Sequence, residues 1–219
     1  MSDGFSPGLA RLVEGYRRFL HSGWEPHRKR WESLREGQQP DVMVIACSDS
    51  RVDPMQIFDV NPGEVFVVRN VAALVPPYET TPGHHGVSAA LEFTVQVIGV
   101  KEIVVLGHGR CGGCKVALTG ELSGAAHGEG GFIADWIALL DGVRGPIVSD
   151  LGTEGRTAEH AMEQAAVQVS LNNLRSFPYI RDKEASGQIR LSGAIFAISD
   201  GLLHLLDETT GEYTPIPNQ

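Results

Sequence analysis

The sequence VMVIACSDSR, at residues 42–51, decides the fold, because it joins an unbroken apolar run to an abruptly polar loop. The run at 42–46 does not alternate between polar and apolar residues. Such a run is typical of a strand that is buried on both faces. Two further runs of this kind lie at 65–68 and 103–106. We therefore expect three buried strands, which is the pattern of a parallel sheet.

Helical segments separate and follow these predicted strands. We expect helices at 82–98, from Gly113 onward, at 131–141 and at 157–177. Strands that alternate with helices indicate βαβ units. Near the C-terminus, two strand patterns at 189–199 and 202–208 flank Asp200 and Gly201, a pair typical of a hairpin turn. The predicted fold class is α/β, with a mostly parallel central β-sheet flanked by helices and a C-terminal antiparallel edge hairpin.

Residues 1–36 have the pattern of an N-terminal helical arm on the single domain that we expect over 1–219. Apolar side chains recur there at helical spacing, at Leu9, Leu12, Val13, Tyr16, Phe19 and Leu20. A second, more polar helix is expected at 24–35, before Gly37 and Pro40 break the pattern. The apolar stripe of the first helix needs a surface to cover it, so we expect the arm to pack on a partner subunit.

The composition excludes several classes of protein. The chain has 219 residues, 42% of them apolar and 21% charged, which suits a globular domain rather than a disordered segment. Its net charge of −9, without a basic run, argues against nucleic acid or an anionic membrane as a partner. No apolar run approaches the roughly 20 residues of a membrane-spanning helix, and the N-terminal sequence has no pattern of a secretory signal. The three cysteines cannot all pair, which favours a reducing compartment, so we expect a soluble cytoplasmic protein.

Three candidate metal ligands follow the predicted strands. Cys47 comes directly after the first strand, His108 comes after the third, and Cys111 follows within the same turn. The carboxyl ends of parallel strands border the crevice in which α/β proteins bind ligands, so we expect these side chains to meet there. A single cysteine in such a position is more often a packing residue than a ligand. Two cysteines and one histidine together match a catalytic zinc site with an open fourth position.

The motifs around these residues resemble those of the β-class carbonic anhydrases. The resemblance rests on CSDSR at 47–51 and HGRCGG at 108–113, and it extends through PGEVFVVRNVAALVPPY at 62–78. It implies zinc-dependent, reversible hydration of carbon dioxide to bicarbonate and a proton. It also implies one Zn²⁺ per chain.

The resemblance assigns a role to five residues of the two motifs. Cys47, His108 and Cys111 would bind the zinc. Asp49 and Arg51 would act as a catalytic pair, in which Asp49 either ligates the metal or pairs with Arg51 and leaves the fourth position open. An aspartate and an arginine two positions apart can form such a bidentate ion pair.

The resemblance also implies a substrate pocket and an oligomer. The pocket residues would be Gln38, Phe66, Val71, Phe93 and the N–H of Gly112. Phe93 lies where tyrosine is common, so one hydroxyl is missing from this pocket. In relatives the glutamine and the aromatic walls come from the neighbouring subunit, which implies a homodimer or a higher homo-oligomer such as a dimer of dimers. Gln38 and Val44 place the chain nearer to the plant-like subgroup.

Two alternatives remain open on the sequence alone. Cys114 follows the second motif, so that Cys47, His108, Cys111 and Cys114 could close a structural, non-catalytic zinc site. A related zinc hydrolase that acts on carbon disulfide or carbonyl sulfide would carry the same motifs. We favour hydration of carbon dioxide over both.

Overall fold

The computed structural model describes residues 4–217, which form two compact units that divide between Gln38 and Gln39. The first unit holds α1 (Pro7–Phe19), the π-helical segment η1 (Leu20–Trp24) and α2 (Arg28–Ser33). The strands of the second unit are β1 (Val42–Cys47), β2 (Val65–Asn70), β3 (Glu102–His108), β4 (Arg190–Ala197), β5 (Leu202–Asp207) and β6 (Glu212–Pro215). Its helical segments are α3 (Pro54–Ile57), η2 (Val71–Ala73), α4 (Gly86–Glu92), η3 (Phe93–Ile98), α5 (Gly112–Thr119), α6 (Gly131–Ile137), η4 (Ala138–Leu140), α7 (Asp141–Leu151), α8 (Arg156–Ser176) and α9 (Pro178–Ala185). None of the helices in this described part is long and apolar enough to cross a membrane.

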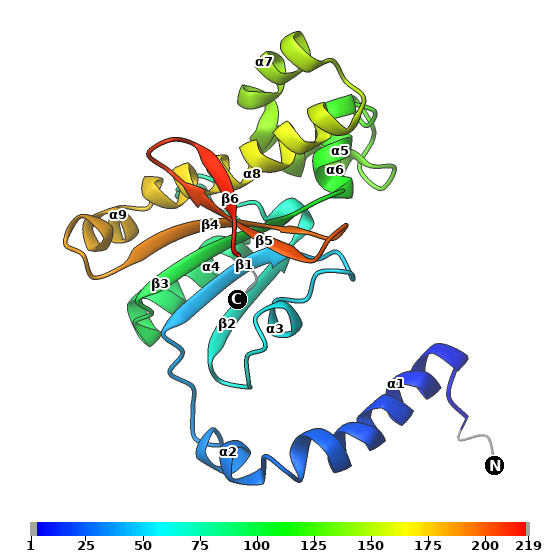
Figure 1. Ribbon diagram of the computed structural model, residues 1–219, viewed down its shortest axis with the longest axis vertical. Helices are drawn as coiled ribbons and strands as arrows, with labels where there is room; N and C mark the ends of the chain where they lie inside the picture. Colours follow the sequence, from blue (N-terminus) through cyan, green and yellow to red (C-terminus); the bar gives the residue numbers. More distant parts are fainter. Residues whose placement is uncertain (1–3, 218–219) are drawn as a thin grey trace. The chain divides into compact units, whose positions relative to one another are not determined.

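The six strands of the second unit form one sheet in the order β2-β1-β3-β4-β5-β6 (Figure 1). The strands from β2 to β4 run parallel to one another. β5 pairs antiparallel with β4, and β6 pairs antiparallel with β5. The predicted α/β class, the mostly parallel sheet and the antiparallel C-terminal edge are therefore confirmed.

The apolar run of β1 supplies core residues to both faces of the sheet, because successive side chains of a strand point to opposite sides. On one face, Met43 and Ile45 are fully buried together with residues of α4 and α8. On the other face, Val44 and Ala46 pack with Leu106 of β3. Burial on both sides explains why this strand shows no polar alternation.

The register of the parallel strands brings the candidate metal ligands to one edge of the sheet. Cys47 is the last residue of β1 and pairs with Asn70, the last residue of β2. His108 is the last residue of β3 and pairs with Phe196 of β4. The carboxyl ends of the three strands therefore lie at the same edge, as the sequence predicted.

The first unit is helical, as expected. Ser6 caps α1, because its side chain accepts a hydrogen bond from the N–H of Leu9 at 3.4 Å. The ring of Phe19 meets the ring of Trp31 edge to face, with centroids 6.0 Å apart. The apolar stripe of α1 stays open to solvent in a single chain, and Leu12 is 72% exposed. The arm was expected at 1–36 and this unit ends at Gln38, while residues 1–3 lie outside the described part.

The elements that were not expected from the sequence include α7, β6 and α9. α7 contains two glycines and Pro146, which are poor helix formers and conceal a helix from its sequence pattern. β6 is a four-residue edge strand that ends in a proline. α8 ends just before Phe177, whose backbone is extended. α9 then begins with Pro178, a residue that is favoured at the first position of a helix.

The helix expected at 82–98 differs from the observed structure at its start and in its winding. It begins at Gly86 as α4 and continues from Phe93 as the π-helical η3. It ends at Gly99, which adopts the left-handed conformation with φ of 82°. Sequence periodicity predicts helical winding in general and does not separate α from π geometry.

Candidate metal centre

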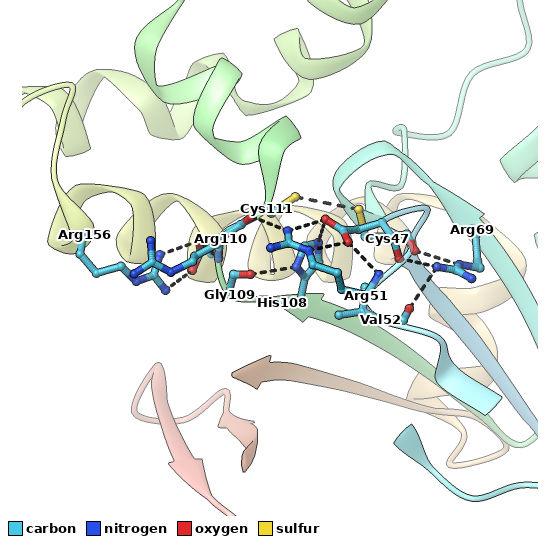
Figure 2. A network of polar contacts seen from close by, with 11 residues as sticks. Cys47, Arg51, Val52, Arg69, His108, Gly109, Arg110, Cys111 and Arg156 are labelled. Carbon is cyan, nitrogen blue, oxygen red and sulfur yellow. Dashed lines mark hydrogen bonds and ion pairs between the residues drawn. The ribbon is translucent and has the colours of Figure 1, made fainter. Parts of the chain in front are cut away.

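Two cysteines and one histidine form a buried cluster at the carboxyl edge of the sheet. Cys47 ends β1, His108 ends β3, and Cys111 is the residue just before α5. One ligand atom of each lies within 4.8 Å of the others, and the two sulfur atoms are 4.0 Å apart. Figure 2 shows Cys47, His108 and Cys111 beside one another. Of the predicted site, the structure brings these three residues together.

The cluster fits a zinc ion. The Nε2 atom of His108 is buried and has no hydrogen-bond partner among the described residues. A buried polar atom is normally paired, so this nitrogen is suited to a missing ligand. The Nδ1 atom lies 3.0 Å from the carbonyl oxygen of Gly109, a contact that fixes the ring and leaves the Nε2 lone pair for a metal. Two thiols and one imidazole match the ligands that zinc prefers, with a fourth position open.

The two thiols of the cluster are held in their neutral form when no cation is bound. Contact with Cys111, together with burial, raises the pKa of Cys47 to about 12. The neighbouring thiol of Cys114, together with burial, raises the pKa of Cys111 to about 12. A metal ion must therefore displace protons to bind here. Cys114 itself is buried in α5 and lies outside the three-residue cluster.

Asp49 lies next to the cluster and is held by Arg51. The Arg51 side chain donates to both carboxylate oxygens, through Nε at 2.9 Å and Nη2 at 2.6 Å, and the Arg51 N–H donates at 2.9 Å. These hydrogen bonds keep the pKa of Asp49 well below its usual range. One carboxylate oxygen lies 3.9 Å from Nε2 of His108. An ionised carboxylate, which can only accept hydrogen bonds, is thus placed beside the candidate metal position.

Arg69, which the sequence analysis missed, holds the loop that carries Asp49. Its guanidinium donates to the carbonyl oxygens of Cys47 at 2.9 Å, of Asp49 at 2.7 Å and of Val52 at 3.1 Å (Figure 2). The signal was present in the sequence, because Arg69 directly follows the apolar run at 65–68. A half-buried arginine at the end of such a strand can donate to several backbone carbonyl oxygens of a neighbouring loop at once.

Val71 lies beside the cluster in a strained turn. Ala72 and Ala73, which follow it, both adopt left-handed backbone angles, with φ of 63° and 55°. The side chain of Asn70 spans this turn, because it exchanges two hydrogen bonds of 2.8 Å with the backbone of Leu74. A Cβ atom at Gly113 would lie only 2.7 Å from the Val71 side chain. Glycine at this position therefore allows Val71 to pack against α5.

Of the remaining predicted pocket residues, Gly112 directly follows the candidate ligand Cys111, whereas Phe66 and Phe93 are not gathered at the cluster of the same chain. Phe66 pairs with Met43, four residues before Cys47, which places it roughly 13 Å along the sheet from the cysteine. Its ring packs on Phe93, with centroids 6.2 Å apart, and Phe93 is 45% exposed. Gly112 begins α5, where backbone N–H groups have no intrahelical acceptor. Gln38 is the exposed last residue of the first unit.

The fold and the cluster together define a class of protein, an α/β chain with a candidate Cys–His–Cys metal centre at the carboxyl edge of a mostly parallel sheet. Comparisons with known proteins give the same class a name. The sequence profile of the carbonic anhydrase family matches residues 42–203. Beta carbonic anhydrase 3 of Arabidopsis thaliana is 35% identical over 200 residues, which cover 90% of this chain and 76% of that protein.

Solved structures give the same result. The β-carbonic anhydrase CcaA superposes with a TM-score of 0.87 at 28% identity, over 98% of this chain and 94% of that one. A tetrameric β-carbonic anhydrase of Sordaria macrospora has a TM-score of 0.74 at 29% identity, over 91% of this chain and 95% of that one. The chain belongs to the β-carbonic anhydrase family and is a carbonic anhydrase. The resemblance found in its motifs is thereby confirmed, and hydration of carbon dioxide is the general activity of this family.

Proposed function

We propose that this chain catalyses the zinc-dependent, reversible hydration of carbon dioxide to bicarbonate and a proton. One Zn²⁺ per chain would be held by Cys47, His108 and Cys111. The observation that carries the proposal is the buried cluster of these three side chains, whose ligand atoms lie within 4.8 Å of one another. A carboxylate oxygen of Asp49 lies 3.9 Å from Nε2 of His108. The chemistry that zinc supplies when bound is Lewis-acid activation of water, whose pKa falls from about 15.7 to about 7 in the active site of a carbonic anhydrase.

Asp49 and Arg51 supply the orientation that the reaction needs. The ionised Asp49 accepts a hydrogen bond from the attacking water and so directs its free lone pair toward carbon dioxide. Arg51 binds both carboxylate oxygens and would keep Asp49 from the metal position. If the pair separated, Asp49 would itself become a ligand of the metal and block access of water.

The proposed substrate pocket combines apolar walls with two donors. Val71, Phe66 and Phe93 suit an uncharged, linear substrate. The side-chain amide of Gln38 and the N–H of Gly112 would donate to the negative oxygens of the product. The distance of Phe66 and Phe93 from the cluster of the same chain supports a pocket whose walls come from a second subunit.

We therefore propose a homo-oligomer, with a dimer as its smallest active form and a dimer of dimers as the expected assembly. The tetrameric relative of Sordaria macrospora supports this assembly, and so does the exposed apolar stripe of α1. In this arrangement residues 1–36 form an arm of a single carbonic anhydrase domain. The three free cysteines support a reducing compartment, which we propose to be the cytoplasm.

Stopped-flow measurement of carbon dioxide hydration, on protein of known zinc content, tests this function. We expect the rate to scale with bound zinc and to vanish when a chelator removes the metal. Full activity in protein freed of metal would contradict the proposal.

A further inference from the structure

A buried carboxylate in α8 has no role in the function proposed above. Glu163 is 2% exposed, because it lies on the buried side of α8, one helical turn from the core residues Ala166 and Val167. A buried charge is unfavourable unless it is paired. Arg156 compensates this charge through Nη1 at 2.7 Å and Nη2 at 2.6 Å, one contact to each carboxylate oxygen.

The same carboxylate binds the backbone between two candidate metal ligands. The N–H of Arg110 donates to Oε1 of Glu163 at 2.7 Å. Arg110 lies between His108 and Cys111 and adopts a left-handed φ of 57°, which is unfavourable for a residue with a Cβ atom. A hydrogen bond to a charged acceptor is stronger than one to a neutral acceptor and can offset this strain.

The other side of Arg110 faces the catalytic pair. Its carbonyl oxygen accepts a hydrogen bond of 3.0 Å from Nη2 of Arg51, the same nitrogen that binds Asp49 at 2.6 Å. The side chain of Arg51 is 47% exposed, so burial alone does not fix its position. Figure 2 shows the arrangement, in which Arg110 lies between Arg156 and Arg51.

We infer that Glu163 is a positioning residue for catalysis. Held by Arg156, it fixes the Arg110 peptide in the conformation that turns its carbonyl oxygen toward Arg51, and thereby orients the Arg51–Asp49 pair. Glu163 acts only through Arg110, because neither of its carboxylate oxygens is bonded to a residue of the metal cluster. The inference rests on the roles proposed for Asp49 and Arg51.

The first test substitutes Glu163→Gln in the full-length, zinc-loaded protein. Glutamine keeps the size and one acceptor oxygen but weakens the hold of Arg156. We expect kcat to fall about tenfold, with little change in KM and with the zinc content of the parent. The visible spectrum of the cobalt-substituted protein, which reports the surroundings of the metal, should shift as well. A variant with the kcat and the cobalt spectrum of the parent would overturn the inference.

A matched control separates positioning from general stability. Glu184 forms an ion pair with Arg175 at the far end of α8, with contacts of 2.8 to 3.1 Å. Glu184→Gln likewise weakens the pairing of an α8 arginine with a carboxylate but should leave kcat and the cobalt spectrum unchanged. An equal loss of kcat in both variants would show that the effect follows stability and would overturn the inference.

The second test uses the backbone strain itself. Glycine adopts left-handed angles without penalty, so Arg110→Gly removes the strain that Glu163 offsets. We expect the loss caused by Glu163→Gln to shrink from about tenfold to less than about threefold in the Arg110→Gly background. Equal losses in the two backgrounds would overturn the inference. A parent without activity, or a fully active Arg51→Ala variant, would instead contradict the proposed function.

Discussion

The guanidinium of Arg51 donates to both carboxylate oxygens of Asp49, at 2.9 and 2.6 Å, while one of those oxygens lies 3.9 Å from Nε2 of His108. An ion pair on a surface loop usually contributes little to stability. Here the same carboxylate can bind either Arg51 or a metal on the histidine, and these two states exclude each other. In the function proposed above, the pair would therefore control access to the fourth metal position rather than the stability of the fold.

Replacing Arg51 should release Asp49 toward the metal. In Arg51→Ala the Asp49 carboxylate loses both hydrogen bonds from the guanidinium. We expect turnover to fall about 10- to 100-fold with zinc still bound. The measurements are zinc content, stopped-flow hydration of carbon dioxide, and zinc X-ray absorption to identify the fourth ligand. Parent turnover, with an oxygen from water as the fourth ligand, would show that Arg51 does not govern the position of Asp49.

Removal of any ligand of the cluster should release zinc. We expect about one zinc per chain in the parent and strong loss of zinc in Cys47→Ser and in His108→Ala. Only three protein side chains would hold the ion, so a variant that lacks one of them keeps too few ligands to bind it tightly. Cys114→Ser is the matched control, since Cys114 is equally buried but lies outside the cluster. Elemental analysis measures the outcome. Loss of zinc in the control to the same extent would favour the structural four-ligand alternative.

The sheet and the cluster were predictable because both follow from local patterns. The apolar run at 42–46 is a strand buried on both faces, and parallel strands must align their carboxyl ends. The cluster of Cys47, His108 and Cys111 then follows from where each strand ends. No such rule predicts α9, because Pro178 is compatible with the end of one helix and with the start of the next.

The supporting contacts of the site were not predictable in the same way. Glu163 is separated from Arg110 by 53 positions, and only the packing of α8 beside β3 brings the two together. The strained angle of Arg110 has no signal in the sequence, since neither glycine nor asparagine occupies the position. A charge within the buried stripe of a helix was the one visible sign that Glu163 has a partner.

Loss of Arg69 should loosen the loop that carries the catalytic pair. Arg69→Leu removes three hydrogen bonds to backbone carbonyl oxygens, so we expect the free energy of unfolding to fall by about 2–4 kcal/mol. Zinc affinity should fall too, because Cys47 is one of the residues held. Denaturant unfolding and zinc competition measure the two effects. Arg190→Gln, at an exposed position of β4, is the control and should change neither.

The apolar stripe of α1 should be buried in the assembly. Leu12 is 72% exposed in the single chain, so Leu12→Glu would be harmless to an isolated subunit. We expect it to dissociate the oligomer, because the charge would be buried in an interface without a partner. Arg11→Glu, on the same helix but outside the apolar stripe, is the control. Sedimentation measures the result, and a Leu12→Glu protein of parent size would place the stripe outside the interface.

A shared active site can be tested by mixing two defective chains. Cys47→Ser should lose zinc, and Gln38→Ala should lower kcat/KM about tenfold by removing a donor to the product. If Gln38 serves the zinc of the partner subunit, a mixed dimer contains one intact site, which combines the zinc of the Gln38→Ala chain with the glutamine of the Cys47→Ser chain.

Random assortment of co-expressed chains should then restore about a quarter of the parent activity per chain, well above the mean of the two separate variants. If Gln38 serves its own chain, every site keeps one defect, and co-expression should give only that mean. The comparison of co-expressed with separately expressed and mixed chains therefore decides which subunit supplies the glutamine.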